Sequence, residues 1–104
     1  MRMLLGTEER AHLDRLGRTV RLARLRRNLS QEELAERMGV SRSSVVMLER
    51  GASGVAIGIL LKALTLFGYG DRLGEILAND PMGEELELAT GRKRSRARDG
   101  VADF

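Results

Sequence analysis

Two short segments in the middle of the chain carry clear signals for where a helix begins and ends. Ser30 and Glu33 form a capping-box pattern, in which the serine hydroxyl accepts from the Glu33 amide and the glutamate reaches back to the Ser30 amide. Gly39 is suited to end this first segment in the left-handed conformation. A second segment starts at Ser41, another good N-cap, and stops before Gly51. The pattern predicts two helices joined by a tight turn.

The spacing of three residues indicates how these two helices meet. When Gln31 is counted as position 1, Ala35 lies at position 5, Gly39 at position 9 and Val45 at position 15. A small alanine allows the helices to approach closely, a glycine tolerates the positive φ of the turn, and a valine fills the contact from the second helix. The combination is specific for the helix-turn-helix unit, and a generic helical hairpin would rarely contain all of it.

Apolar periodicity predicts helices on both sides of this unit. One is expected from Thr7, acting as N-cap, to about residue 27, with a possible break at Gly17. An apolar helix near the centre of the core is expected at about residues 56–67, and a short one at residues 71–77. The sequence Asn-Asp-Pro at residues 79–81 is a breaker, and residues 82–89 fit either a short strand or one or two helical turns.

These elements predict an all-α fold. We expect a five-helix domain over residues 1–80 and a C-terminal extension over residues 81–104. From residue 91 onward the composition is too polar to bury a core, which predicts a flexible basic tail.

Charge is distributed unevenly, although the net charge is only +3. Residues 1–50 carry 11 basic and 7 acidic side chains, residues 51–90 carry 2 and 6, and residues 91–104 carry 5 and 2. Sixteen of the 18 basic residues are arginine, whose planar guanidinium suits phosphate. The pattern indicates two surfaces with different partners, the alternative being a near-neutral protein with an arginine-rich composition.

Composition argues against several classes of protein. The absence of cysteine excludes disulfides, thiolate metal sites and a cysteine nucleophile, and it fits a cytoplasmic protein, nucleoid-associated when bound to DNA. A single histidine, His12, disfavours a Ser-His-Asp hydrolase or a histidine-rich zinc site. We therefore expect neither an enzyme nor a cofactor. No apolar run approaches about 20 residues, so no membrane partner is expected.

The chain resembles the Cro/C1-type (Xre) helix-turn-helix family in the sequences LSQEELAERMGVS at residues 29–41 and LERG at residues 48–51. The resemblance covers about residues 14–78 and implies a lambda-repressor-like domain that binds operator DNA. A narrower similarity to HipB-like antitoxins, which are encoded beside HipA-type kinase toxins, lies in residues 55–58, 66–68 and 79–81 and in the basic C-terminal extension. It implies a HipA-like kinase toxin as a partner.

A helical wheel over the second helix of the unit separates a core side from an outward side. Val45 and Leu48 point together toward the core. The expected base contacts come from the outward side and its shoulder, namely Arg42, Ser43, Val46 and Met47. Arginine can bind guanine with two hydrogen bonds, serine can bond to either base type, and the apolar pair can pack on a thymine methyl. Relatives often have Gln or Thr at the position of Met47, and a protein–protein surface at this apolar pair is the alternative.

Contacts to the phosphate backbone should position the protein on DNA. The candidates are Gln31, Ser44, Arg24, Arg27 and Arg50. Gln31 opens the first helix of the unit, where side chain and amide can meet a phosphate. The family resemblance implies that Arg24 pairs with Glu49 and is thereby presented to the backbone. For each arginine at the end of the first helix, a solvated charge is the alternative.

A single recognition helix contacts few bases, so we expect a homodimer on a palindromic operator. The expected interface residues are Leu73, Ile76, Leu77, Leu86 and Leu88. The tail offers Arg92, Arg94, Arg96 and Phe104 for a protein partner first and DNA second, with an unconstrained tail as the alternative.

The sequence leaves three hypotheses for the function of the protein. The first is a dimeric repressor that is the antitoxin of a HipBA-like module, and the second is a stand-alone or phage-type regulator. The third is an interaction module without operator binding, which the outward Arg42–Ser43 pair disfavours.

Overall fold

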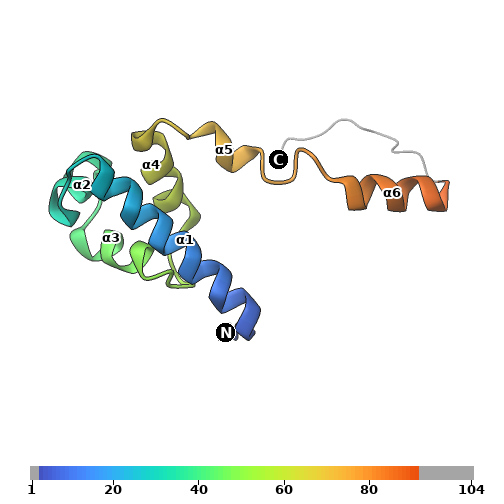
Figure 1. Ribbon diagram of the computed structural model, residues 1–104, viewed down its shortest axis with the longest axis horizontal. Helices are drawn as coiled ribbons and strands as arrows, with labels where there is room; N and C mark the ends of the chain where they lie inside the picture. The colour runs from blue at the N-terminus through green and yellow to red at the C-terminus, as the bar shows by residue number, and fades with distance from the viewer. Residues whose placement is uncertain (1–2, 92–104) are drawn as a thin grey trace. The chain divides into compact units, whose positions relative to one another are not determined.

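The computed structural model describes residues 3–91, and the predicted tail residues Arg92, Arg94, Arg96 and Phe104 lie outside this range. The described part of the chain is all-α, as predicted, with no strand (Figure 1). Its six helices are α1 (Thr7–Arg26), α2 (Gln31–Met38), α3 (Arg42–Glu49), α4 (Ile57–Phe67), α5 (Asp71–Gly74) and α6 (Pro81–Thr90). None of these helices has the length and apolar character needed to cross a membrane.

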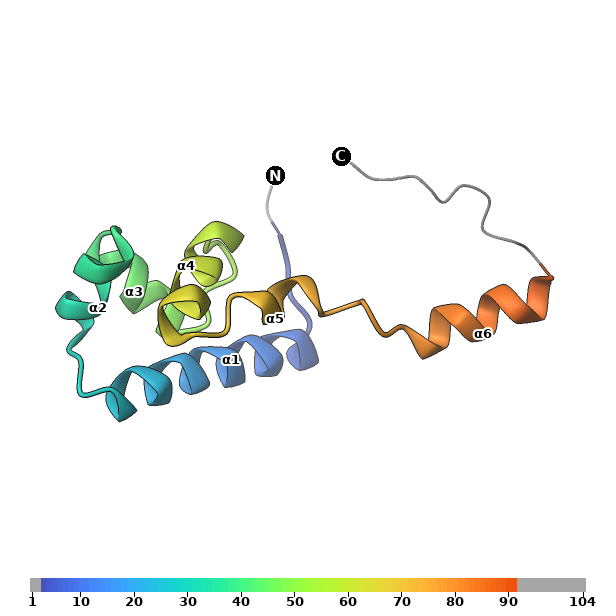
Figure 2. The same ribbon diagram turned by 90° about the horizontal axis from the view of Figure 1, so that it is seen from above.

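The chain divides into two compact units, one up to Leu73 and the other from Gly74 onward. In the first unit, α1 runs along one side of the group formed by α2, α3 and α4 (Figure 2). The second unit contains α6. Each unit is described by itself.

Helix α1 is continuous over 20 residues, so the possible break at Gly17 does not occur. Gly17 is buried, and a Cβ atom there would collide with the backbone of Glu49 and Gly51. The glycine is therefore explained by the close approach of α1 to the end of α3. The expected N-cap is also corrected, because Thr7 is the first helical residue and the Gly6 amide donates to the Glu9 carboxylate at 2.9 Å.

The caps predicted around α2 are confirmed. The Glu33 amide donates to Ser30 Oγ at 3.0 Å, and the Ser30 amide donates to Glu33 Oε1 at 2.8 Å. Gly39 has φ +73° and ends the helix, and the following Val40 amide donates back to the Ala35 carbonyl at 3.0 Å. These bonds satisfy polar groups that a helix of eight residues would otherwise leave open at both ends.

The core lies where α2, α3 and α4 meet the C-terminal half of α1. Leu34 and Val45, from the two helices of the unit, are fully buried and contribute on the order of 1.5–3 kcal/mol each. The other buried apolar residues are Val20, Leu29, Ala35, Met38, Leu48, Ala63 and Phe67. This packing fixes the orientation of α3 relative to α2.

Helix α4 is less buried than its composition predicted. Only Ala63 and Phe67 are buried, while Ile57 in the first turn is 70% exposed. The expected N-terminal residue Ala56 is the N-cap. One side of α4 therefore packs against α2 and α3, and the other side presents apolar side chains to solvent.

The C-terminal region differs from expectation in two respects. Helix α5 ends at Gly74 rather than near Leu77 and is followed by turns. The ambiguous segment forms α6, which begins after the N-cap Asp80 because its carboxylate accepts from the Gly83 amide at 3.0 Å. Pro81 occupies the first turn, where its missing amide hydrogen is no loss, so the sequence read as a breaker also starts a helix.

Candidate nucleic-acid interface

The outward side of α3 carries the residues predicted to contact bases. Val45 and Leu48 are buried, whereas Arg42 and Ser43 are exposed and Met47 is 43% exposed. Val46 is half-buried, so less of its side chain is available than the helical wheel indicated. The side chains at the N-terminal end of α3 are thus polar and charged, and those further along are apolar.

The first turn of α3 is organised by three serine hydroxyls. The Ser44 amide donates to Ser41 Oγ at 3.2 Å, which caps the helix. Ser41 Oγ also lies 3.1 Å from Ser43 Oγ and 3.0 Å from Ser44 Oγ. Because each hydroxyl can donate or accept, this cluster can reorient its hydrogen atoms toward a phosphate or a base edge.

A buried ion pair joins the end of α1 to the end of α3. Arg24 Nε donates to Glu49 Oε2 at 2.6 Å, and Arg24 Nη2 donates to Glu49 Oε1 at 3.0 Å. Arg24 Nη1 donates to the Leu29 carbonyl at 2.8 Å. The hydrogen bond with Glu49 raises the pKa of the Arg24 guanidinium, against the opposing effect of burial. The pairing implied by the family resemblance is confirmed.

Burial changes what Arg24 can do at a DNA surface. The residue is 6% exposed, and both carboxylate oxygens of its partner are occupied by its guanidinium. This geometry favours a positioning role for Arg24 over the direct phosphate contact that the sequence indicated. A charged pair of this kind holds its two elements in one relative arrangement when its hydrogen bonds are made.

Gln31 is tied to the same ion pair. Its side-chain nitrogen Nε2 donates to Glu49 Oε1 at 3.1 Å, and the side chain is half-buried. The main-chain amide of this residue belongs to the first turn of α2 and has no intrahelical acceptor. The network therefore fixes the first residue of α2, with an amide available to an anion, relative to the end of α3.

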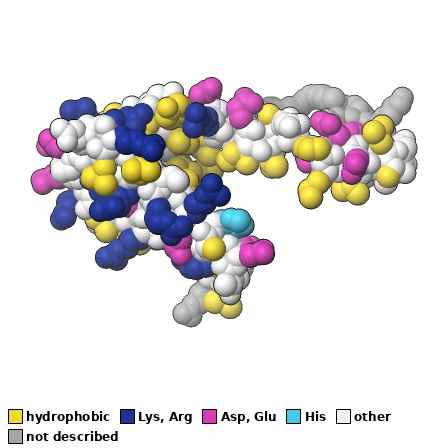
Figure 3. Space-filling view, in the orientation of Figure 1, with side chains coloured by type: hydrophobic (Ala, Val, Ile, Leu, Met, Phe, Trp, Pro, Cys, Tyr) yellow, Lys and Arg dark blue, Asp and Glu magenta, His cyan; other side chains and the backbone are white. Residues whose placement is uncertain are grey.

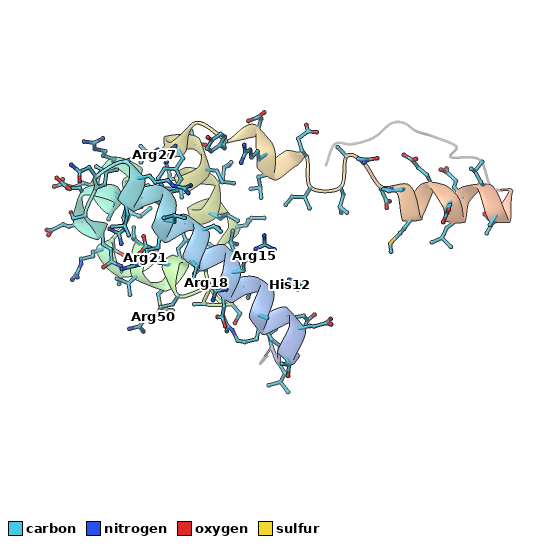
Figure 4. The ribbon with its side chains drawn as sticks, viewed as in Figure 1. His12, Arg15, Arg18, Arg21, Arg27 and Arg50 are labelled. Atoms are coloured by element: carbon cyan, nitrogen blue, oxygen red, sulfur yellow. The ribbon has the colours of Figure 1, made fainter. Side chains whose placement is uncertain are left out.

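The other predicted phosphate contacts have different surroundings. Arg27 donates to the Ala23 carbonyl at 2.9 Å and to the Phe67 carbonyl at 3.0 Å, and its guanidinium carbon lies 4.7 Å from the Phe67 ring centroid. These contacts join α1 to the end of α4. Arg50, the C-cap of α3, is exposed and projects outward from the helices (Figure 4).

Lys and Arg side chains gather over the first unit, as the dark blue atoms of Figure 3 show. They include three exposed arginines of α1 that the sequence analysis did not single out, Arg15, Arg18 and Arg21 (Figure 4). The signal was present in the sequence, since side chains three residues apart on a helix are neighbours.

The residues predicted for a dimer interface are accessible. Leu73 is half-buried, and the others, Ile76, Leu77, Leu86 and Leu88, are exposed.

Comparison with known protein families identifies the family to which the two helices α2 and α3 belong. A helix-turn-helix family model matches residues 20–71, which is half of the chain, and this range contains α2, α3 and α4 completely. No curated protein and no solved structure matches the chain. The chain therefore belongs to the Xre-type helix-turn-helix family of DNA-binding transcriptional regulators.

Proposed function

We propose that the protein is a sequence-specific repressor that binds a palindromic DNA operator as a homodimer. The observation that carries this proposal is the exposed end of α3, where Arg42 and Ser43 stand on a helix held by the buried Arg24–Glu49 pair. A recognition helix must keep its orientation when it enters the major groove, and this pair stabilises that orientation.

Base recognition would use the two chemical parts of the α3 surface. Arg42 would donate two hydrogen bonds to a guanine, and Ser43 would bond to a neighbouring base. Met47, together with the accessible part of Val46, would pack against a thymine methyl group.

Phosphate contacts would fix the protein on the duplex. The amide of Gln31 would bind one phosphate at the start of α2, and the Ser44 hydroxyl a second at the start of α3. Arg50 would add a charge contact at the other end of α3, and Arg27 would add one only by giving up its bonds to the protein. In a two-fold symmetric dimer the two copies of α3 would lie about 34 Å apart.

The contact assigned to Arg42 can be tested with selected operators. Duplexes bound by the wild-type chain are selected from a random pool, and the affinity of Arg42→Ala for the selected sequence is measured. We expect a loss of about 1–3 kcal/mol and relaxed preference at one base pair. Arg15→Ala is the matched control, because it removes an exposed arginine from α1 and should change binding only through overall charge. Equal affinity of Arg42→Ala and wild type would contradict the groove assignment.

The finer proposal is that this repressor is the antitoxin of a HipBA-like module. Its support is the HipB-like pattern of residues 55–58, 66–68 and 79–81 and the basic C-terminal extension, which the family resemblance associates with a kinase partner. A kinase-like reading frame beside the gene, whose product co-purifies with this chain, is the expected result. A chain without such a neighbour would instead be a stand-alone or phage-type regulator.

A tail deletion tests the role of residues 91–104 in that module. We expect the shortened chain to fold and dimerise, to bind DNA modestly less well in a salt-dependent manner, and to capture the toxin poorly. Full neutralisation of the toxin by the shortened chain would exclude a partner-binding tail.

A further inference from the structure

An apolar groove lies between α2 and α4 on the first unit. It has a volume of about 460 Å³, and we call it the α2–α4 groove. Its apolar lining comes from Met38, Gly58, Leu61 and Leu66. Leu61 is 41% exposed, and a Cβ atom on Gly58 would meet nothing, so the groove is open to solvent. No residue of α3 lines it, so an occupant would leave the recognition residues free.

Two cations border the α2–α4 groove. Arg37 comes from the last turn of α2 and Lys62 from the middle of α4, and both are exposed. Within the described residues, neither forms an ion pair within 4 Å. A groove with an apolar floor and basic borders is suited to a helix that is apolar on one side and acidic beside it.

Helix α6 has these properties. Met82, Leu86 and Ala89 follow the spacing of one helical face, and Glu85 lies next to that face. The helix carries three glutamates, no basic residue and no buried residue. Apolar and acidic side chains alternate along it in Figure 3. Isolated helices of this length are marginally stable in water, so α6 requires a surface against which to bury its apolar face.

We propose that α6 of one protomer docks in the α2–α4 groove of a second copy, and that the exchange is reciprocal. The charges are complementary, since Glu85 would face the border that contains Lys62. Reciprocal exchange closes a two-fold dimer and covers both grooves with both helices. Residues 75–80 connect α5 to α6 and can span at most about 20 Å, so the exchange requires a groove of the second protomer within that reach. The inference rests on the proposed homodimer and specifies how that dimer is held together.

Disulfide crosslinking can test the exchange directly, because the wild-type chain has no cysteine. Two single variants of the full chain, Leu61→Cys in the groove and Leu86→Cys on α6, are mixed and oxidised. We expect a covalent heterodimer as the main product. The matched control replaces Leu86→Cys by Glu84→Cys, which lies on the opposite side of α6 and should crosslink poorly.

The double variant Leu61→Cys/Leu86→Cys distinguishes exchange from docking within one chain. Covalent dimers support the proposal, and a monomer with an internal disulfide overturns it. Absence of the mixed heterodimer also overturns it. If the wild-type chain then still sediments as a dimer and binds its operator, the proposed function stands and only the exchange is wrong.

Charge reversal provides an independent measurement on the same pair of surfaces. Lys62→Glu should weaken dimerisation about two- to fivefold in sedimentation equilibrium, and adding Glu85→Lys should restore it. Equal dissociation constants for wild type, single and double variants would contradict the proposed orientation of α6. Circular dichroism of each variant establishes that the helices are intact.

Discussion

Helices α2 and α6 have similar local signals but very different surroundings. Each has a side-chain N-cap, Ser30 for α2 and Asp80 for α6, and each is followed by a glycine with positive φ. Helix α2 has eight residues, of which three are buried, whereas the ten residues of α6 include none. The comparison teaches that capping determines where a helix begins and ends, while its packing is determined by what the rest of the chain offers.

The difference also separates two sources of stability. Burial of α2 against α3 stabilises the fold of one protomer, and its Gly39 turn fixes the approach of the two helices. Helix α6 has apolar side chains that can stabilise only an assembly in which they become buried. Substitutions in the two helices should therefore respond differently to protein concentration.

The largest expected effect comes from truncating an apolar side chain in each helix. Leu34→Ala should lower the free energy of unfolding by about 2–5 kcal/mol, because Leu34 is fully buried. Leu86→Ala should change it by less than about 0.5 kcal/mol in dilute monomer, because Leu86 is 67% exposed. Denaturant titration monitored by circular dichroism measures both values. Comparable losses in the two variants would remove the distinction drawn between the helices.

Two glycines sharpen the comparison between packed and open surfaces. Gly17→Ala should destabilise the protein by about 1–3 kcal/mol, although alanine favours helices, because its Cβ would meet the backbone at Glu49. Gly58→Ala should stabilise it by about 0.4–1 kcal/mol, because nothing lies near its added methyl group. Thermal unfolding of both variants gives the two signs, and a stabilising Gly17→Ala would contradict the close approach of α1 to α3.

Removing the N-cap of each helix should have a smaller effect, and it tests whether α2 contributes to global stability while α6 does not. Ser30→Ala should lower the free energy of global unfolding by about 1 kcal/mol, since α2 is part of the core. Asp80→Ala removes the equivalent bond to the Gly83 amide and should reduce only the local helicity of α6. Hydrogen exchange can separate the outcomes, because Ser30→Ala should speed exchange across the first unit and Asp80→Ala only in residues 81–90.

Sequence analysis predicted the parts of the fold that depend on local signals. The capping box of α2 and the positive φ of Gly39 were both predictable, because each follows from one residue and its immediate neighbours. The buried pair between Arg24 and Glu49 came from family resemblance, since 25 residues separate its members. The continuity of α1 through Gly17 was not predictable, because the contact that favours glycine comes from the distant backbone of Glu49.

In the candidate site, too, features set by local sequence were predictable and features set by tertiary contacts were not. Helical periodicity correctly separated the buried Val45 from the exposed Arg42, but it did not show that Val46 is half-buried. It also could not show that Arg27 is bonded to the Phe67 carbonyl, because this contact spans 40 residues of sequence. Tertiary contacts of this kind decide which arginines are available to a phosphate.

The smallest expected effect is a dependence of stability on pH that arises in α2. Hydrogen bonds from the Ser30 amide, and then from its hydroxyl, hold the pKa of Glu33 below its ordinary value. Folding therefore favours the ionised carboxylate of Glu33. The stability that this carboxylate contributes is present above its unfolded pKa and is lost as the pH falls through its folded pKa.

Glu33→Gln keeps the capping geometry without the charge, so its unfolding midpoint should fall less steeply on acidification than that of wild type. Glu84→Gln in α6 is the matched control, because it removes a carboxylate from a helix that has no buried residue, on the side away from the proposed contact. Midpoints measured across the acid range for the three chains decide the matter, and equal slopes for Glu33→Gln and wild type would show that the capping carboxylate contributes no acid sensitivity.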